Sequence, residues 1–164
     1  MTGSDASDGR DGGELPASPP PGGLADDPRV SVVIPTYNDV TRIGDALSSI
    51  VAQTTVPSEI VVCDDGSDDG TEEFVRQFAD ASARGVSIRY LRLPGRSGPA
   101  AARNAGVALA SGEWIAACDS DDMWVPAKLE RQLAFLREWH GRRPIAVLGC
   151  HGYNVNDAKQ ILSA

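Results

Sequence analysis

Short apolar runs alternate with stretches of helical periodicity from Val30 to Cys150. Continuous β-branched runs are typical of strands covered on both faces, and apolar residues recurring every third or fourth position indicate helices. The pattern predicts strands at Val30–Pro35, Glu59–Cys63, Val86–Leu93, Glu113–Cys118 and Ile145–Cys150. It predicts helices carrying Ile43, Leu47, Ile50 and Val51; then Phe74, Val75 and Phe78, behind a capping box at Asp69 and Glu72; then Pro99–Ala110; then Leu129, Leu133 and Leu136 after Pro126.

Strands that alternate with helices form βαβ units, so the fold class predicted is α/β, with a mostly parallel sheet and helices on both faces. Polar clusters follow three of the strands directly, at residues 36–39, 64–67 and 119–122. In a parallel sheet these clusters share the carboxyl edge. If the strand order is the usual one of third, second, first and fourth, the first and fourth strands are neighbours at the switch point, where ligands bind.

Composition divides the chain into two parts. Residues 1–28 hold six Gly, five Pro and six acidic residues against one Arg, which predicts a disordered tail. The tail carries −5 of the total charge of −8, so residues 29–164 carry only −3. These residues form the predicted domain, and they contain no basic stripe of the kind that nucleic-acid-binding proteins show.

Cysteine usage and hydropathy bear on the compartment. Cys63, Cys118 and Cys150 are widely spaced, each at the end of an apolar run, which predicts buried free thiols in a reducing environment. No signal pattern opens the sequence, and no apolar run approaches the roughly 18 residues of a membrane span. We therefore expect a cytoplasmic protein without a membrane span.

The fourth predicted strand ends in three carboxylates within four residues, Asp119, Asp121 and Asp122. Crowded carboxylates repel one another, raise one another's pKa and usually require a cation. Oxygen ligands on an Asp-x-Asp spacing suit Mn²⁺ or Mg²⁺, with Asp119 and Asp121 as the candidate ligands. The alternative is a turn or helix cap that binds nothing, although a cap needs only one Asp, such as Asp122.

Three further residues have both a structural and a functional interpretation. Asp65 belongs to an Asp-Gly turn signal, but at the crevice its carboxylate could accept hydrogen bonds from a base or a ribose. Tyr37 is either an ordinary half-buried aromatic or a flat surface on which a base stacks. Arg103 is either solvated or a clamp for a phosphate or carboxylate.

Four ordered blocks of this sequence resemble the nucleotide-sugar half of family 2 glycosyltransferases. They are Val30 to Asn38, Glu59 to Ser67, Ala102 to Gly106, and Asp119 to Asp122, so the resemblance covers residues 29 to about 150. The resemblance implies a GT-A fold and an inverting transfer from a nucleotide-sugar such as a UDP-sugar, with Mn²⁺ or Mg²⁺.

The resemblance also assigns residue roles. Tyr37 would stack near the base, Pro35, Thr36 and Asp65 would hold base and ribose, Asp119 would contact ribose or a metal-bound water, and Asp121 would ligate the metal. Ser120, Arg103 and Asn104 join the predicted donor site, as does Asp39, which stands where the family often has Glu.

The family's general base and acceptor-binding region lie well after the Asp-x-Asp block, whereas this sequence ends at Ala164. We therefore expect an incomplete domain whose catalytic base is unassigned and whose acceptor is unknown. Its uncovered apolar edge would favour self-association. Two alternatives stay open: a truncated or degenerate donor-binding module without transfer activity, and a sugar nucleotidyltransferase. The second usually has a Gly-rich loop after the first strand, and residues 35–39 contain no Gly.

Overall fold

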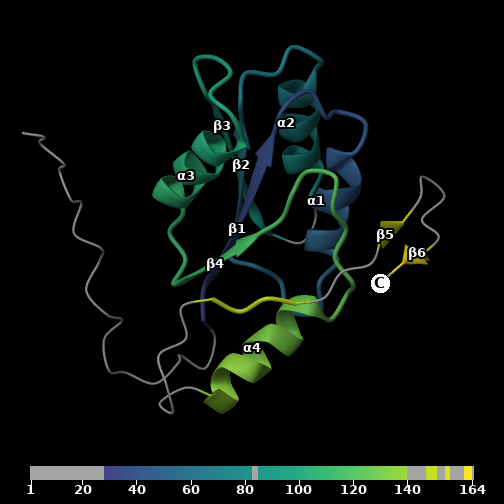
Figure 1. Cartoon of the computed structure of the whole chain (residues 1–164), viewed down its shortest axis with the longest axis vertical. Coiled ribbons are helices and arrows are strands. Elements are labelled where there is room, and N and C mark those ends of the chain that lie inside the picture. Colours follow the sequence, from purple (N-terminus) through teal and green to yellow (C-terminus); the bar gives the residue numbers. More distant parts are fainter. Residues whose placement is uncertain (1–27, 83–84, 140–146, 151–153, 156–160, 164) are drawn as a thin grey trace, which may run out of the picture.

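The computed structural model describes residues 28–82, 85–139, 147–150, 154–155 and 161–163 (Figure 1). All but the last residue of the predicted tail, 1–28, lies outside these described residues. Of the described helices, none is long and apolar enough to cross a membrane.

A parallel sheet of four strands forms the centre of the fold, in the order β3-β2-β1-β4. This is the predicted α/β architecture, and the strand order is the usual one assumed above. Every residue of β1 and β2 is buried, because helices cover both faces at the middle of the sheet, whereas β4 at the edge alternates between half-buried and exposed side chains. The four strands are β1 (Val30–Thr36), β2 (Glu59–Asp64), β3 (Ser87–Arg92) and β4 (Trp114–Ala117).

The two faces of the sheet carry different helices, α1 (Ile43–Val51) and α2 (Thr71–Ala81) on one side and α3 (Pro99–Leu109) on the other (Figure 1). Alternate residues of β1 separate accordingly: Val32 packs in the cluster with α1 and α2, and Val33 in the cluster with α3. The approach of α3 is close. A Cβ on Gly106 would meet the Cγ1 of Val33 at 2.5 Å, so a glycine is required there.

Helix α4 (Lys128–Trp139) begins two residues after Pro126, and it buries the three predicted leucines, Leu129, Leu133 and Leu136. The predicted capping box of α2 is wrong. Gly70 occupies the N-cap position without a side-chain cap, and Asp69 instead accepts hydrogen bonds from the N–H and hydroxyl of Thr71. The carboxylate of Glu72 pairs with Arg76 at 2.8 Å instead of capping the helix.

The predicted fifth strand, Ile145–Cys150, is wrong over its described part. Residues 147–150 form no strand, and Val147 is 86% exposed, because this apolar run pairs with no described strand. Residues 145–146 lie outside the described part of the chain. A small antiparallel pair follows instead, β5 (Asn154–Val155) and β6 (Ile161–Ser163).

All three cysteines are free, as predicted, but they are not all buried. Burial raises the pKa of Cys63 to about 11 and that of Cys118 to about 12, the latter with help from nearby carboxylates. Both thiols are therefore protonated at neutral pH and chemically inert. Cys150 is exposed, because the segment that carries it is not part of the sheet.

Candidate functional site

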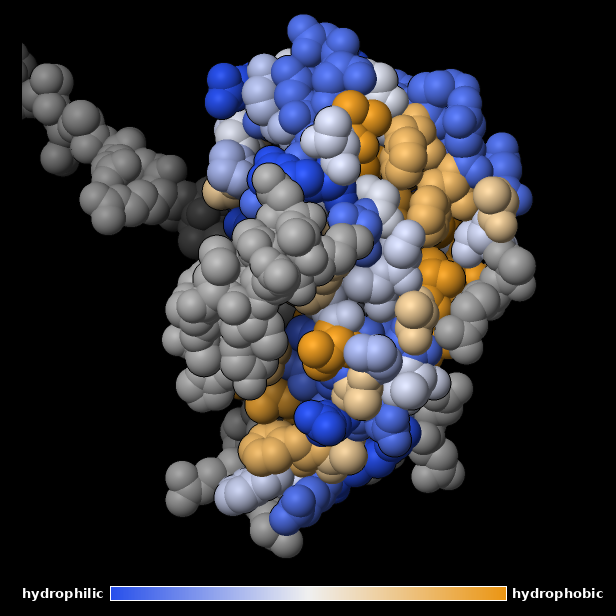
Figure 2. Space-filling view, turned by 90° about the vertical axis from the view of Figure 1, so that its right-hand side faces the viewer, coloured by the Kyte–Doolittle hydropathy of each residue, from blue (hydrophilic) through white to orange (hydrophobic). Residues whose placement is uncertain are grey.

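The loops that follow β1, β2 and β3 lie at the same end of the sheet (Figure 1). Hydrophilic side chains dominate that end of the molecule in Figure 2. The first two loops are tied together, since the backbone N–H of Asn38 donates to the hydroxyl of Ser67 at 2.8 Å and the side chain of Asn38 donates to Asp68 at 2.9 Å. Asn38 adopts a positive φ of 48°, a conformation that Asn tolerates better than most residues.

The loop after β4 joins the same cluster. The hydroxyl of Ser120 donates to the carboxylate of Asp39 at 2.6 Å, and Asp39 is only 4% exposed. Arg42 donates to Asp39 at 2.6 Å and to Asp121 at 3.2 Å. Polar clusters from three separate strands therefore converge at the switch point, as the strand order predicts.

A cavity of about 410 Å³ opens between these loops. Eight of the ten residues predicted for the donor or metal site line it: Pro35, Thr36, Tyr37, Asp65, Arg103, Asp119, Ser120 and Asp121. The other two do not. Asp39 is buried and accepts the hydroxyl of Ser120, and Asn104 is exposed on α3.

Asp65 shapes the cavity wall. Its carboxylate is 3% exposed and accepts the backbone N–H groups of Ser97 at 2.6 Å and Gly98 at 2.8 Å. These bonds hold the loop between β3 and α3 against the turn after β2. Each carboxylate oxygen keeps a second lone pair, so the group can still accept a hydrogen bond from a molecule in the cavity.

The same loop brings in a residue that the sequence analysis missed, Arg96. Its guanidinium lies 4.5 Å from the ring centroid of Tyr37, which is a cation–π distance, and both side chains line the cavity. The ring of Tyr37 is 39% exposed, so it is not a core aromatic. The signal for Arg96 was a basic residue in the short Gly95–Gly98 segment following the third strand.

The two candidate metal ligands are exposed and paired with arginines. The side chain of Asp119 is 56% exposed and accepts Arg103 at 2.8 Å, and that of Asp121 is 51% exposed and accepts Arg42 at 3.2 Å. Asp122 shows the expected effect of crowding, since partial burial and then the charges of Asp119 and Asp121 raise its pKa. None of the three caps α4, which begins at Lys128, although a backbone bond from Asp122 to Asp119 does form a turn.

The two candidate ligands fit a metal ion whose remaining coordination positions are filled by another molecule. The described residues contain no group of three or more His, Cys, Asp or Glu side chains that could hold a metal ion. Two carboxylates at a cavity mouth suit Mg²⁺ or Mn²⁺, because such ions are commonly bound by one or two carboxylates together with phosphate oxygens and waters.

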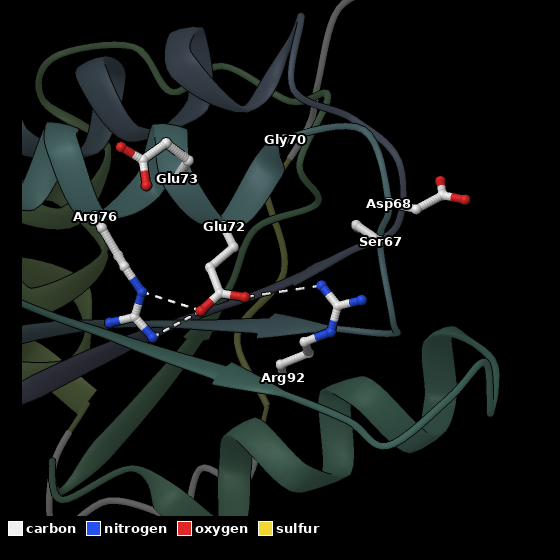
Figure 3. A pocket seen from close by; sticks show the side chains of 7 residues that line it. All are labelled: Ser67, Asp68, Gly70, Glu72, Glu73, Arg76 and Arg92. Carbon is white, nitrogen blue, oxygen red and sulfur yellow. Dashed lines mark hydrogen bonds and ion pairs between the residues drawn. The ribbon is translucent and has the colours of Figure 1, made fainter.

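A second cavity, of about 400 Å³, lies beside α2 and β3 (Figure 3). Its two arginines already have partners, since Glu72 pairs with Arg76 at 2.8 Å and with Arg92 at 3.8 Å. Figure 3 shows Glu72 between the two guanidinium groups. Because these opposite charges neutralise one another, the second cavity is a weaker candidate for a ligand site than the first.

The profile of the family described as Glycosyl transferase family 2 matches residues 31–158. The chain belongs to this family. Family membership also disfavours the nucleotidyltransferase alternative. The UDP-Glc:alpha-D-GlcNAc-diphosphoundecaprenol beta-1,3-glucosyltransferase WfgD of Escherichia coli is 39% identical over 111 residues, which are 68% of this chain and 42% of that protein. The putative teichuronic acid biosynthesis glycosyltransferase TuaG of Bacillus subtilis is also 39% identical, over 68% of this chain and 43% of its own length. The chain thus spans less than half the length of these relatives.

Solved structures agree on the fold. A crystal structure of S. aureus TarS 1-349 in complex with UDP has a TM-score of 0.62 at 33% identity, covering 68% of this chain and 33% of that one. The mannosyltransferase PcManGT from Pyrobaculum calidifontis, in complex with GDP-Man and Mn²⁺, has the same TM-score and identity, covering 70% and 34%. The family 2 chain described here thus has the GT-A-like α/β fold predicted from its sequence.

Proposed function

We propose that this family 2 chain binds a nucleotide-sugar, specifically a UDP-sugar, together with Mn²⁺ or Mg²⁺, as the donor-binding part of an inverting glycosyltransferase. One observation carries the proposal: the cavity at the switch point unites an exposed aromatic ring, a buried carboxylate and two exposed carboxylates from three separate loops. The relatives named above support it, because one acts on a UDP-glucose donor by name and one solved structure holds UDP.

Each side chain would contribute according to its chemistry. The ring of Tyr37 offers a face for the base, and Asp65 offers a fixed acceptor for a base N–H or a ribose hydroxyl. Pro35 and Thr36 also line the cavity, and the hydroxyl oxygen of Thr36 is buried without a hydrogen-bond partner among the described residues. Asp119 would contact the ribose or a metal-bound water.

Asp121 would ligate the metal, which supplies Lewis-acid neutralisation of the diphosphate leaving group when bound. Ser120 and Asp39 would hold the Asp-x-Asp loop in place through their hydrogen bond of 2.6 Å. Arg103 lines the cavity and carries a charge suited to a phosphate, while Asn104, which does not line it, would act at its rim.

The proposal also covers the cellular compartment of the chain and its partners. Three free cysteines favour a reducing compartment, so we propose that the chain works on the cytoplasmic side, with no nucleic-acid partner. Its apolar surface includes Phe135 and Trp139, whose stacked rings are 41% and 38% exposed on α4. We propose this surface as the place where the isolated chain self-associates.

Calorimetry of UDP binding with and without Mn²⁺ tests the donor site. We expect Mn²⁺ to strengthen UDP binding. Asp121→Ala should remove that gain and lower the UDP affinity measured with Mn²⁺ by about 100-fold or more. Glu73→Ala is the matched control, since Glu73 is an exposed carboxylate beside the second cavity. UDP affinity that is unchanged by a chelator would show that the metal assignment is wrong.

A second candidate is a donor-binding module without transfer activity. Every carboxylate among the described residues that line the cavity, namely Asp65, Asp119 and Asp121, is already assigned to donor or metal, so none is left to act as a general base. UDP release from UDP-glucose separates the two candidates. Binding without any release supports the module, and release above the solvent background supports the transferase.

A further inference from the structure

Arg42 links two loops that are far apart in the sequence. It precedes α1 and lies 79 positions before Asp121, which is in the loop after β4. Its Nε donates to Asp39 at 2.6 Å and its Nη1 to Asp121 at 3.2 Å. Arg42 does not line the cavity, although Asp121 does. The guanidinium therefore contacts Asp121 without being among the residues that line the cavity.

A buried carboxylate fixes the position of this charge. Asp39 is 4% exposed, and its carboxylate oxygens accept both Arg42 and the hydroxyl of Ser120. Its backbone carbonyl also accepts the N–H groups of Arg42 and Ile43, at 3.1 and 3.0 Å. A charge held on a buried acceptor stays near Asp121, whereas a fully solvated arginine would move freely.

From these contacts we infer that Arg42 is a positioning residue that keeps the affinity of Asp121 for a divalent cation low until a nucleotide diphosphate arrives. The inference rests on the proposed function. A divalent cation on Asp121 is repelled by a fixed positive charge on the same carboxylate. The diphosphate brings negative charge and oxygen ligands, which offset that repulsion. Metal and nucleotide therefore bind cooperatively, and by linkage each raises the affinity of the other by the same factor.

Arg103 differs from Arg42 in a way that makes the effect separable. Arg103 pairs with Asp119 at 2.8 Å but also lines the cavity, so replacing it would alter the donor site directly. Replacing Arg42 changes the charge beside Asp121 and leaves the residues that line the cavity unchanged. Arg42 is thus the residue with which to test control of the metal site.

The test measures free Mn²⁺ by its paramagnetic resonance signal during titration, first without nucleotide and then with saturating UDP. We expect Arg42→Gln to tighten Mn²⁺ binding without nucleotide by about 3- to 10-fold. With UDP present the affinity should change by less than about 2-fold, so the factor by which UDP strengthens Mn²⁺ binding falls. Arg42→Lys keeps the positive charge and should stay within about 2-fold of the original chain in both titrations.

Arg76→Gln is the matched control, because Arg76 is similarly exposed (59% against 60%) and paired with a carboxylate, Glu72, away from the donor cavity. Arg42→Met is prepared alongside Arg42→Gln, and a cooperative melting curve is required of whichever variant is titrated. Unchanged or weaker Mn²⁺ binding without nucleotide in a folded charge-removing variant overturns the inference. So does equal tightening by Arg42→Lys.

The two proposals fail in different ways. If UDP does not strengthen Mn²⁺ binding by the original chain, the proposed donor site is wrong and the cooperative part of this inference falls with it. If UDP does so and Arg42→Gln leaves that factor unchanged, only the role of Arg42 is wrong. If the factor falls as expected, both proposals are supported.

Discussion

Two pairs of carboxylates in this molecule have opposite environments. The structural carboxylates, Glu59 and Asp64, are 5% and 0% exposed on β2, whereas the side chains of the crevice carboxylates, Asp119 and Asp121, are 56% and 51% exposed. Glu59 accepts the hydroxyl of Ser31 at 2.6 Å and both the N–H and hydroxyl of Ser111, at 2.6 and 2.8 Å. Each of the two crevice carboxylates accepts an arginine from another element: Asp119 accepts Arg103 of α3, and Asp121 accepts Arg42 at the start of α1.

The difference separates stability from binding. A buried carboxylate is tolerated when hydrogen bonds replace its lost hydration, so its removal costs folding free energy. An exposed carboxylate paired with an arginine contributes little to stability, because water screens the pair, and its oxygens are open to a metal. Sequence position does not distinguish the two kinds, since Asp64 is the last residue of β2 and Asp119 follows the end of β4 by only two residues.

The largest expected effect on stability is that of Glu59→Ala. The substitution leaves the backbone N–H and the hydroxyl of Ser111 without their acceptor. It also removes the carboxylate that lies 3.3 Å from Arg89. We expect the free energy of unfolding to fall by about 3 kcal/mol. Urea denaturation of this variant and of Asp121→Ala compares the two environments directly. Equal losses in both would show that the comparison is wrong.

The pH dependence of stability sharpens the same contrast. Burial alone would raise the pKa of Glu59, but hydrogen bonds from Ser31, Ser111 and Arg89 outweigh it and lower this pKa from 4.5 to about 2. A lowered carboxyl pKa in the folded state adds stability that is complete above pH 4.5 and is lost as the pH falls toward 2. The loss should amount to about 3 kcal/mol.

Urea titrations of the original chain and of Glu59→Gln between pH 6 and pH 2.5 measure this dependence. Because Gln does not titrate, the difference in unfolding free energy between the two proteins should shrink steadily as the pH falls below about 4.5. A constant difference across the range would mean that Glu59 is not the titrating group.

A smaller loss is expected for Tyr90→Phe. The hydroxyl of Tyr90 donates to Asp64, which also accepts the N–H of Ser67 at 2.9 Å. Loss of one of several donors to a buried carboxylate should cost about 1–2 kcal/mol. Tyr37→Phe is the matched control, since Tyr37 is 39% exposed, and it should change the unfolding free energy little. Thermal melting of both variants decides the matter, and a larger loss in Tyr37→Phe would count against the interpretation.

The smallest effect on stability is expected for Asp119→Asn and Asp121→Asn. Each loses one exposed ion pair, so the unfolding free energy should change by no more than about 0.5 kcal/mol. Chemical denaturation without metal or nucleotide is the measurement. A loss above about 2 kcal/mol would place these residues with the structural carboxylates.

The sequence alone determined the α/β class and the edge at which the polar clusters meet, whereas the strand order was taken from the usual arrangement of such folds. Period-2 and period-3.6 patterns are local properties, and the carboxyl-edge rule then follows from parallel strands. The Asp-x-Asp spacing was also visible locally, whereas only the structure showed that the ring of Tyr37 is exposed. The same logic failed at Val147, because an apolar run reveals only a preference for burial and not whether a neighbouring strand is there to pair with it.

The tertiary structure alone decided which charges meet. Arg42 and Asp121 are 79 residues apart, and Asp65 receives its two hydrogen bonds from Ser97 and Gly98, which lie in another loop. Such pairings depend on how loops from different strands pack, and the local sequence pattern carries no signal for them. For the same reason the sequence did not predict Arg96 in the cavity. Its position over Tyr37 follows from the hydrogen bonds between Asp65 and the loop that carries Arg96.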